Sequence, residues 1–238
     1  MKQAPIPADI TFVDFKCPHC ENGVSFPDQV IGRPQECPTC SQILIVPKPG
    51  EEYGAKLPVP FQTPRLLLRR LTMDDANDLL EIVGDVEVAR NYEWYPMDEH
   101  EVQFWLATDL KKPLFQREGL SYLALELLGE PKVIGFATMA YTDNEYSEMT
   151  ADVCVNSNYQ RRGIGTEAFR GVMQLIFVGL NVRRLCTGCS SKNHAGVCVL
   201  ENSKLRREGE FLKSKFVKGK WTNTVQFALL QEEYVSMA

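Results

Sequence analysis

A short basic segment with two glycines carries the clearest chemistry in this chain. Residues 160–165 read Gln-Arg-Arg-Gly-Ile-Gly, follow a strand-like run at Val153–Val155 and precede apolar residues spaced as on one helix face from Thr166 onward. A helix that begins after such a loop leaves N–H groups unpaired at the positive end of its dipole, which favours a bound anion. Gly163 and Gly165 let a ligand approach the backbone, and the two arginines supply charge for phosphate oxygens. The segment therefore predicts an anion-binding loop.

Three interpretations of this loop compete. Gly163–Ala168 fits the dinucleotide pattern Gly-x-Gly-x-x-Gly/Ala, but that pattern needs an acid about twenty positions on, and residues 181–200 contain none. Gln160–Gly165 also resembles the coenzyme A pyrophosphate loop of GNAT acyltransferases, whose pattern is Gln/Arg-x-x-Gly-x-Gly/Ala. The third interpretation is an ordinary loop with two glycines and two solvated arginines.

Four cysteines near the N-terminus have the spacing of metal ligands. They form two C-x-x-C pairs with sixteen residues between them, and a segment this small cannot bury enough apolar surface to hold itself together. A structural zinc site is therefore predicted, in a segment that resembles a zinc ribbon with short strands at residues 10–15, 24–26 and 42–46. Two disulfides, a redox pair and a rubredoxin-like iron site are the alternatives. The four ligands are Cys17, Cys20, Cys37 and Cys40.

A further C-x-x-C pair, Cys186 and Cys189, falls on a predicted core strand. Buried unpaired thiols are common in protein cores. We therefore expect free thiols there rather than a second metal or redox site.

Composition restricts the class of protein. The chain has 238 residues and a net charge of −5, which argues against general nucleic-acid binding. No apolar run approaches the ~18 residues of a membrane helix, and the N-terminus lacks the apolar core of a signal peptide, so a cytoplasmic protein is expected. Proline and glycine are dense in residues 47–64. This predicts a zinc-ribbon-like domain at 1–50, a linker at 51–61 and a larger domain at 62–238.

The larger domain reads as alternating strands and helices. Thr72 is a predicted N-cap with Asp75 at the capping-box position, Gly129-Glu130 is a predicted hairpin turn, and Asn193 is a predicted N-cap. Strands are expected at 63–71, 121–128, 132–141, 183–187 and a C-terminal pair within 206–230, with helices near 72–83, 98–110, 166–180 and 193–201.

In this order the elements of residues 62–234 resemble the GNAT branch that includes the ribosomal-protein N-terminal acetyltransferases. The resemblance rests on the loop at residues 160–165, the opening at residues 63–94 and the helix that begins at Asn193. It implies an α+β GNAT fold, with a mixed, largely antiparallel central sheet flanked by helices, preceded here by the small zinc ribbon. It also implies transfer of an acetyl group from acetyl-CoA to a primary amine of a protein N-terminus, a polyamine or another small molecule.

The resemblance also assigns roles to residues. The acetyl-CoA contacts would come from the backbone of one strand, from the loop and its helix, and from the N-cap of the later helix. Assistance with the amine proton would come from Glu148 or Asp152; the alternative for each is a solvated acid at a strand edge. The acetyl-CoA contacts are Val153, Val155, Gln160, Arg161, Arg162, Gly163, Ile164, Gly165, Thr166 and Asn193.

Several positions depart from the family pattern. Leu200 stands where many members have a tyrosine that acts as a general acid, Gly196 where the ribosomal branch often has a serine, and Thr150 where a glutamate is common. The missing tyrosine and serine favour an alternative function, which the intact loop at residues 160–165 disfavours: a catalytically weak acetyl-CoA-binding domain that serves, with the zinc ribbon, as a protein-interaction module. A homodimer is compatible with either function.

The acceptor amine is predicted to be cationic. Residues 85–99, which the resemblance places on the acceptor side, contain five acids and one arginine together with three aromatic residues. Acids attract a protonated amine, and aromatic faces accept its charge. Glu93 and Trp94 are the predicted acceptor contacts. The alternative is a solvated acidic helix end with its aromatic residues in the core.

Overall fold

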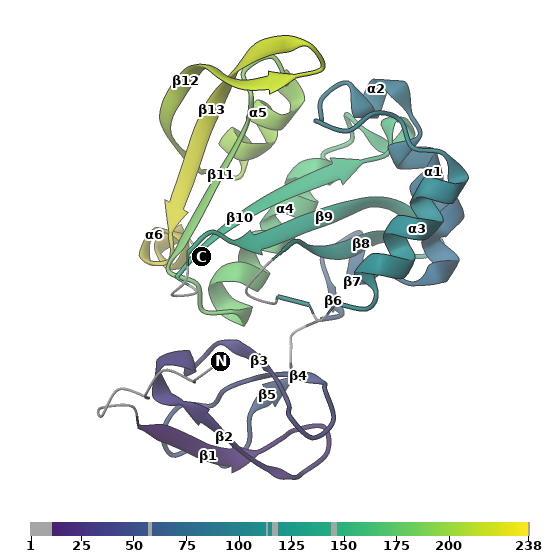
Figure 1. The fold of residues 1–238 in the computed structure, drawn as a ribbon. Helices are drawn as coiled ribbons and strands as arrows, with labels where there is room; N and C mark the ends of the chain where they lie inside the picture. Colours follow the sequence, from purple (N-terminus) through teal and green to yellow (C-terminus); the bar gives the residue numbers. More distant parts are fainter. Residues whose placement is uncertain (1–10, 57–58, 113, 116–118, 144–146, 238) are drawn as a thin grey trace, which may run out of the picture. The chain divides into compact units, whose positions relative to one another are not determined.

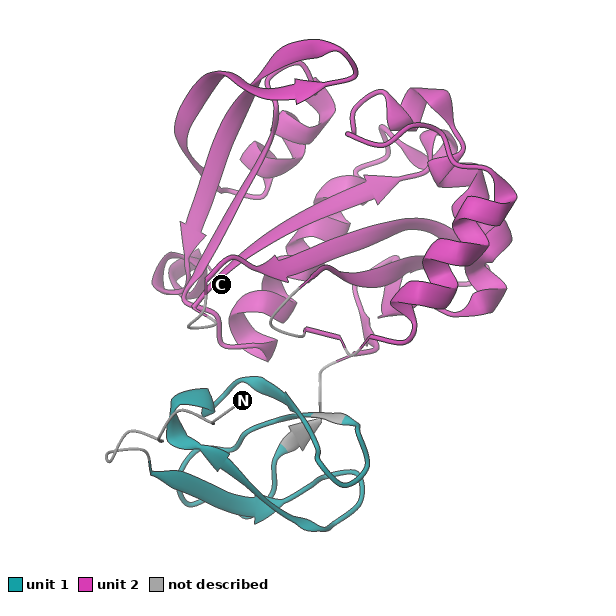
Figure 2. Cartoon of the chain, in the orientation of Figure 1, with its two compact units in different colours: residues 1–57 teal, residues 58–238 magenta. Residues whose placement is uncertain are grey.

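A computed structural model describes residues 11–56, 59–112, 114–115, 119–143 and 147–237. The chain divides into two compact units, residues 1–57 and residues 58–238 (Figure 2). We call them the small unit and the large unit.

The small unit consists of short antiparallel strands around a core that, among the described residues, includes two of the cysteines. β1 (Phe12–Lys16) pairs with β2 (Gly23–Pro27), and a 3-10 turn follows at Asp28–Val30. A second sheet has the order β3-β4-β5. The core is Phe15, Cys17, Val24, Cys37, Leu44 and Val46.

The small unit extends further along the chain than the sequence predicts. β3 (Pro34–Glu36) and β4 (Ile43–Ile45) are joined by β5 (Ala55–Lys56), and the Lys16 N–H donates to the Glu52 carbonyl at 2.9 Å. Residues 52–56, predicted as linker, therefore pair with strands of the small unit. An extended segment can do this because its backbone groups are free to complete an exposed sheet edge.

The large unit is built on one eight-stranded sheet in the order β12-β13-β11-β10-β9-β8-β7-β6. Every neighbouring pair is antiparallel except β10 and β11, which are parallel. The mixed, largely antiparallel sheet of the GNAT fold is confirmed. The strands are β6 (Phe61–Gln62), β7 (Leu66–Arg70), β8 (Ser121–Leu127), β9 (Val133–Tyr141), β10 (Glu148–Val155), β11 (Arg184–Ser190), β12 (Arg206–Val217) and β13 (Lys220–Leu230).

Helices cover both faces of this sheet. Figure 1 shows α1 and α3 against one face and α4 against the other. No described helix is both long and apolar enough to span a membrane. The helices are α1 (Ala76–Val83), α2 (Val86–Ala89), α3 (Glu99–Asp109), α4 (Ile164–Gln174), α5 (His194–Asn202) and α6 (Gln231–Met237), with 3-10 turns at Met73–Asp75 and Ser157–Tyr159.

Local signals position the helix ends. Thr72 and Asp75 form the predicted capping box, and the Asn193 side chain accepts from the Gly196 N–H at 3.0 Å, as expected of an N-cap. α4 begins two residues earlier than the sequence predicts. Gly163 is its N-cap, with a φ of 74° that few other residues adopt, and one wide π-type turn at Leu175–Gly179 ends the helix.

The edge strand β12 is irregular. Its pairing with β13 shifts register between Arg207 and Gly209 and again between Phe211 and Lys215. Lys213, inside the second irregularity, has a φ of 48°. β12 is therefore a bulged edge whose side chains are mostly exposed.

Gly135→Ala tests how closely β9 and β10 pack. A Cβ at Gly135 would collide with the carbonyl oxygen of Cys154 and lie 3.1 Å from a methyl group of Leu125. We expect a loss of about 1–3 kcal/mol in the free energy of unfolding, measured by urea denaturation. The control is Gly209→Ala, where a Cβ would meet nothing within 4 Å and no loss is expected. Equal stability of Gly135→Ala and the parent would show that this contact is not tight.

Candidate active site

β10 and β11 separate shortly after they meet. They pair at Glu148 with Arg184 and at Met149 with Leu185, and nowhere beyond. Each strand keeps a partner on its other side, β9 for β10 and β13 for β11. The Thr187 hydroxyl donates to the Ala151 carbonyl at 2.6 Å and closes the floor of the opening. The result is a cleft between two strands of one sheet.

One edge of β10 faces this cleft. The Asn156 N–H donates to Ile134 of β9, so the even-numbered residues of β10 bond to β9 and the odd-numbered residues turn their N–H and C=O groups toward the opening. The carbonyl of Val153 accepts from the Tyr92 hydroxyl at 3.1 Å, and that of Val155 accepts from the Gln160 side-chain amide at 2.9 Å. Side chains from two other segments thus make the hydrogen bonds that a neighbouring strand would otherwise make.

Asp152 lies inside the cleft. Its side chain is exposed to solvent, but protein atoms of the surrounding walls disfavour the charged form and raise the pKa of Asp152 to about 6. The Val153 N–H, which donates to the carboxylate at 2.8 Å, and the charge of Lys215 act in the opposite direction. A carboxylate with a pKa near 6 is a stronger base than an ordinary aspartate and remains ionised at neutral pH.

The glycine loop closes one end of the cleft and is held from outside by Arg65. Arg65 Nη1 donates to the Arg162 carbonyl at 2.9 Å, and Arg65 Nε lies 2.6 Å from Glu167 Oε2 on the first turn of α4. Burial raises the pKa of Glu167, but hydrogen bonds from Thr63 and Arg65 outweigh it and lower that pKa. Glu167 therefore stays charged and keeps the loop and the start of α4 in one place.

A cavity of about 480 Å³ joins these parts. Its walls come from β10, β11, the glycine loop, α4, α5 and the segment after α1. It brings together eight of the ten residues predicted to contact acetyl-CoA, together with Asp152. These eight are Val153, Val155, Gln160, Arg161, Gly163, Gly165, Thr166 and Asn193.

The arrangement matches a known family. Residues 65–206 match the model of the acetyltransferase (GNAT) domain. The chain belongs to the GNAT acetyltransferase family. It is therefore an acyltransferase by family, as the sequence predicts.

Relatives and solved structures agree with this assignment. The GNAT chain is 23% identical over 181 residues to the uncharacterised N-acetyltransferase p20 of Bacillus licheniformis, covering 72% of this chain and 96% of the relative. It is 20% identical over 169 residues to spermidine N(1)-acetyltransferase of Escherichia coli K12, covering 71% and 88%.

Two solved structures show the same fold. A GNAT-family acetyltransferase from Bacillus anthracis superposes with a TM-score of 0.66 at 20% identity, over 72% of this chain and 98% of that one. Spermidine N-acetyltransferase from Vibrio cholerae, solved with CoA and spermine, gives 0.63 at 14% identity, over 73% and 99%.

Five predicted residues of the GNAT site lie outside the cavity: Arg162, Ile164, Glu148, and the two predicted acceptor contacts Glu93 and Trp94. Arg162 places its guanidinium 5.5 Å from the ring centre of Tyr159, and Ile164 is buried; both line a hollow on the other side of the loop. Glu148 lies at the closed end of the opening, where Arg184 Nε is 2.7 Å from its Oε2. The structure thus separates Glu148 from Asp152 and leaves Asp152 as the acid in the cleft.

Trp94 is part of an aromatic cluster rather than of the cavity wall. Its ring stacks on Tyr92 with centroids 4.0 Å apart and packs near Phe136. Its indole N–H is buried with no hydrogen-bond partner among the described residues. Trp94 thus packs against Tyr92, whose hydroxyl donates to the Val153 carbonyl in the cleft.

Glu93 is exposed and paired, because Lys215 Nζ on β12 lies 2.7 Å from its Oε1. The sequence did not single out Lys215, Thr187 or the hydroxyl of Tyr92. For Tyr92 the signal was present, since it lies in the acidic segment beside the predicted contacts. For Thr187 and Lys215 no local pattern could have revealed the role, because their partners are distant in sequence.

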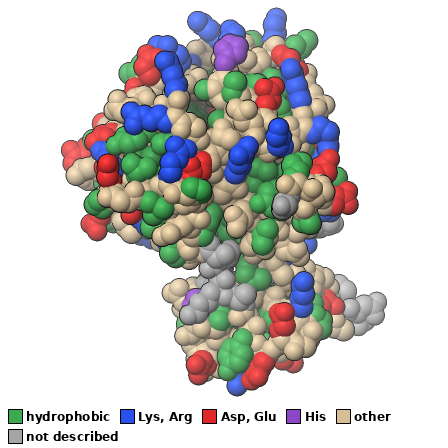
Figure 3. Space-filling view, turned by 180° about the vertical axis from the view of Figure 1, so that it is seen from behind, with side chains coloured by type: hydrophobic (Ala, Val, Ile, Leu, Met, Phe, Trp, Pro, Cys, Tyr) green, Lys and Arg blue, Asp and Glu red, His purple; other side chains and the backbone are tan. Residues whose placement is uncertain are grey.

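Figure 3 shows basic side chains gathered over the upper part of the large unit, with acidic side chains among them and at its flanks.

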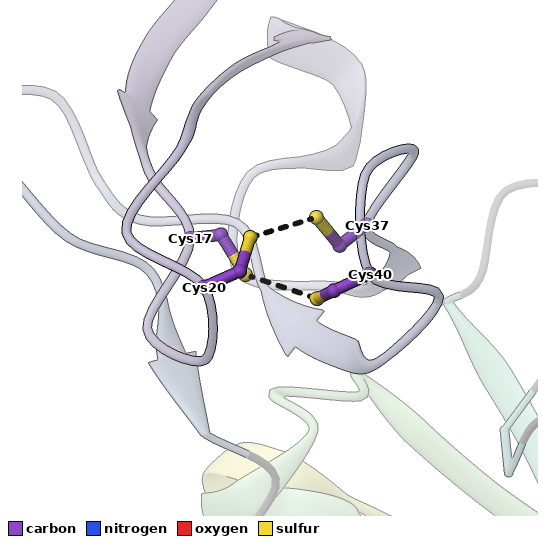
Figure 4. Close-up of side chains that lie close together, drawn as sticks. All are labelled: Cys17, Cys20, Cys37 and Cys40. Carbon is purple, nitrogen blue, oxygen red and sulfur yellow. Dashed lines mark hydrogen bonds between the residues drawn. The ribbon is translucent and has the colours of Figure 1, made fainter.

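The four N-terminal cysteines converge (Figure 4). Cys17 Sγ lies 3.8 Å from Cys40 Sγ, Cys20 Sγ lies 3.9 Å from Cys37 Sγ, and all four sulfurs lie within 4.8 Å of one another. These separations are far longer than a disulfide bond of about 2.05 Å. A tetrahedral ion with metal–sulfur bonds of about 2.3 Å places its sulfurs roughly 3.8 Å apart, so the geometry fits such an ion.

Cys186 and Cys189 do not form a second cluster. Residues three apart on a strand point to opposite faces, so their thiols cannot reach one ion. Cys189 lines the cavity, where burial raises its pKa to about 11, whereas Cys186 accepts from the Gln226 side chain at 2.9 Å. Among the described residues, the N-terminal cysteines alone form a group that could hold a metal.

Proposed function

We propose that this GNAT chain transfers the acetyl group of acetyl-CoA to a primary amine. One observation carries the proposal: a single cavity connects the glycine loop and the start of α4, where phosphates can bind, with Asp152 between the separated strands. An anion-binding end and a basic carboxylate in the same cleft are the two features that the reaction needs.

The chain's own groups divide the binding of acetyl-CoA between them. Loop N–H groups at the positive end of α4, with Arg161, bind the phosphates. The cleft-facing edge of β10 at Val153 and Val155 would offer hydrogen bonds to the extended part of the molecule and to the thioester oxygen once acetyl-CoA replaces the Tyr92, Gln160 or Asp152 side chains that bond to it. Acetyl-CoA itself supplies the activated acetyl group.

Asp152 acts on the acceptor. An amine is protonated at neutral pH and must lose a proton before its nitrogen can attack, and the Asp152 carboxylate accepts that proton directly or through water. Tyr92 remains neutral because burial raises its pKa well above the usual value, so it serves as a hydrogen-bond donor that fixes the Val153 carbonyl. Leu200, buried in the cavity wall, offers no hydroxyl for the departing thiolate.

The acceptors to test are those named for the relatives and those implied by the family: polyamines, peptide N-termini and small amines. A catalytically weak acetyl-CoA-binding module is the second candidate, favoured by the leucine at position 200. An assay of thiol release over a panel of amines separates them, because a module binds acetyl-CoA without turnover.

Asp152→Asn tests the base. Asp152 is protonated below about pH 6, so kcat/KM of the parent should rise as pH increases through about 6. In the variant, kcat/KM should no longer rise with pH and should be about 10²–10⁴-fold lower than in the parent. The acetyl-CoA affinity, measured by calorimetry, should be unchanged. Glu148→Gln removes a carboxylate outside the cavity, and its kcat/KM should still rise as pH increases through about 6. An Asp152→Asn enzyme with the parent's pH profile would show that another group is the base.

Gly163→Ala tests the loop. A Cβ there would lie 3.6 Å from Arg65 Nη2 and would strain the left-handed backbone that presents the loop N–H groups, and we expect the acetyl-CoA dissociation constant to increase at least about tenfold. Gly129→Ala is the matched control, since Gly129 also has a positive φ, of 89°, and lies in a hairpin turn with open space around it. Equal affinity of the two variants, measured by calorimetry, would contradict the loop assignment.

We also propose that Cys17, Cys20, Cys37 and Cys40 hold a structural zinc ion. Four thiolates at tetrahedral separations are the ligand set that zinc prefers in structural sites. The His19 N–H donates to Cys17 Sγ at 3.4 Å, a contact that stabilises a thiolate. The ion would cross-link the β1–β2 and β3–β4 hairpins, whose shared core is small.

Elemental analysis tests the zinc proposal. The purified chain should carry about one zinc ion, Cys37→Ser should lose it, and Cys198→Ser, an exposed thiol outside the cluster, should keep it. Loss of zinc should make the segment before residue 57 sensitive to protease. Iron in place of zinc, or a disulfide between these cysteines in the purified protein, would overturn the proposal.

A further inference from the structure

We infer that the acceptor carries its amine next to negative charge, on carboxylates or phosphates, and is not a polycation. This inference rests on the proposed acetyl transfer and defines the acceptor class of the same site. It reverses the cationic acceptor that the sequence predicts, for reasons that lie in contacts between distant segments.

The acids of the acceptor side are already engaged. Residues 85–99 contain five carboxylates, of which two are neutralised by ion pairs within the protein and three accept hydrogen bonds from uncharged groups. Their partners are the Glu87 N–H for Asp85, Arg90 for Glu87, Lys215 for Glu93, the Glu101 N–H for Asp98 and the Gln103 side chain for Glu99.

The β12–β13 hairpin brings positive charge to the same segment. Residues 211–224 contain four lysines and no acid. Lys215 pairs with Glu93, while Lys218 Nζ donates to the Ala89 carbonyl at 2.7 Å and lies 5.2 Å from the ring centre of Tyr95. Figure 1 shows the hairpin tip extending toward α2, over the gap between β11 and β10.

This charge acts at the reacting position. Val88, Asn91 and Tyr92, neighbours of the residues that the lysines contact, line the cavity. The charge of Lys215 reaches Asp152, whose pKa it lowers. Lys220 shares the face of Lys215, because the register pairs Val217 with Lys220 and Lys215 with Thr222.

The lining of the cavity itself offers few acidic side chains to a polycation. Asp152 is the acid among the described lining residues, and Arg161 at the loop is the basic one. A polyamine with one nitrogen at Asp152 would place its remaining charges toward the lysines of the hairpin. An acceptor with carboxylates or phosphates close to its amine would instead be attracted by them.

The experiment compares acceptors that differ in charge. Four-residue peptides sharing one N-terminal residue, followed by acidic, neutral or basic residues, are assayed with spermidine and an aminoalkyl phosphate at low and high salt. We expect kcat/KM for the acidic peptide to exceed that for the neutral one at least about tenfold at low salt, and the ratio to fall as salt screens the lysines. Preference for the aminoalkyl phosphate over the acidic peptide would identify phosphate as the source of the charge, and the reverse would identify carboxylates.

Charge reversal locates the effect. Lys213→Glu with Lys220→Glu leaves the Lys215 and Lys218 contacts in place and should remove most of the preference, with acetyl-CoA affinity unchanged. The matched control is Lys111→Glu with Lys112→Glu. These exposed lysines follow α3 and lie beside β7, three strands from β10, and the preference should persist.

Three results would overturn the inference. Faster acetylation of spermidine or of the basic peptide, or equal rates for all peptides, would refute it and leave acetyl transfer intact. A preference that survives the hairpin variant would refute the role of the lysines. Acetyl-CoA binding without transfer to any amine would refute the proposed function and this inference together.

Discussion

The loss of pairing between β10 and β11 after Met149 and Leu185 is the constraint on which the site depends. A buried strand edge with unpaired backbone groups is costly, so it persists only where other donors replace the missing strand. Here Thr187, Tyr92 and Gln160 donate to three successive cleft-facing carbonyls of β10. These donors come from β11, from the segment after α2 and from the glycine loop. The opening is therefore stabilised by the same elements that form its walls.

The electrostatics of the cleft follow from its shape. The walls on both sides of Asp152 disfavour its charged form and raise its pKa, while Lys215 on the β12–β13 hairpin acts in the opposite direction. Lys215 also pairs with Glu93, so the group that tunes the base contacts the acceptor side as well. Substitutions in the hairpin would therefore alter both the pKa of Asp152 and the contacts of the acceptor side.

The sequence predicted the features that local spacing determines. The glycine loop, the capping box at Thr72 and the N-cap at Asn193 depend on residues a few positions apart, and the structure has all three. The sequence could not show which of the two acids, Glu148 or Asp152, lies in the cleft. Both lie on one strand and point the same way, and they differ because Arg184 of β11 reaches Glu148 before the strands part. The pairing of Glu93 with Lys215 spans 122 positions and left no local pattern, so the acidic segment resembled a free surface.

The edges of the large sheet limit how copies of this chain can associate. A neighbouring chain continues a sheet only where several consecutive N–H and C=O groups lie in line. β12 breaks that line twice, and Lys213 turns its backbone into a left-handed conformation between the breaks. β6, at the opposite edge, has two residues. Among the described residues, the breaks in β12 and the shortness of β6 therefore leave the large sheet little continuous edge to which a second copy of this chain could add a strand.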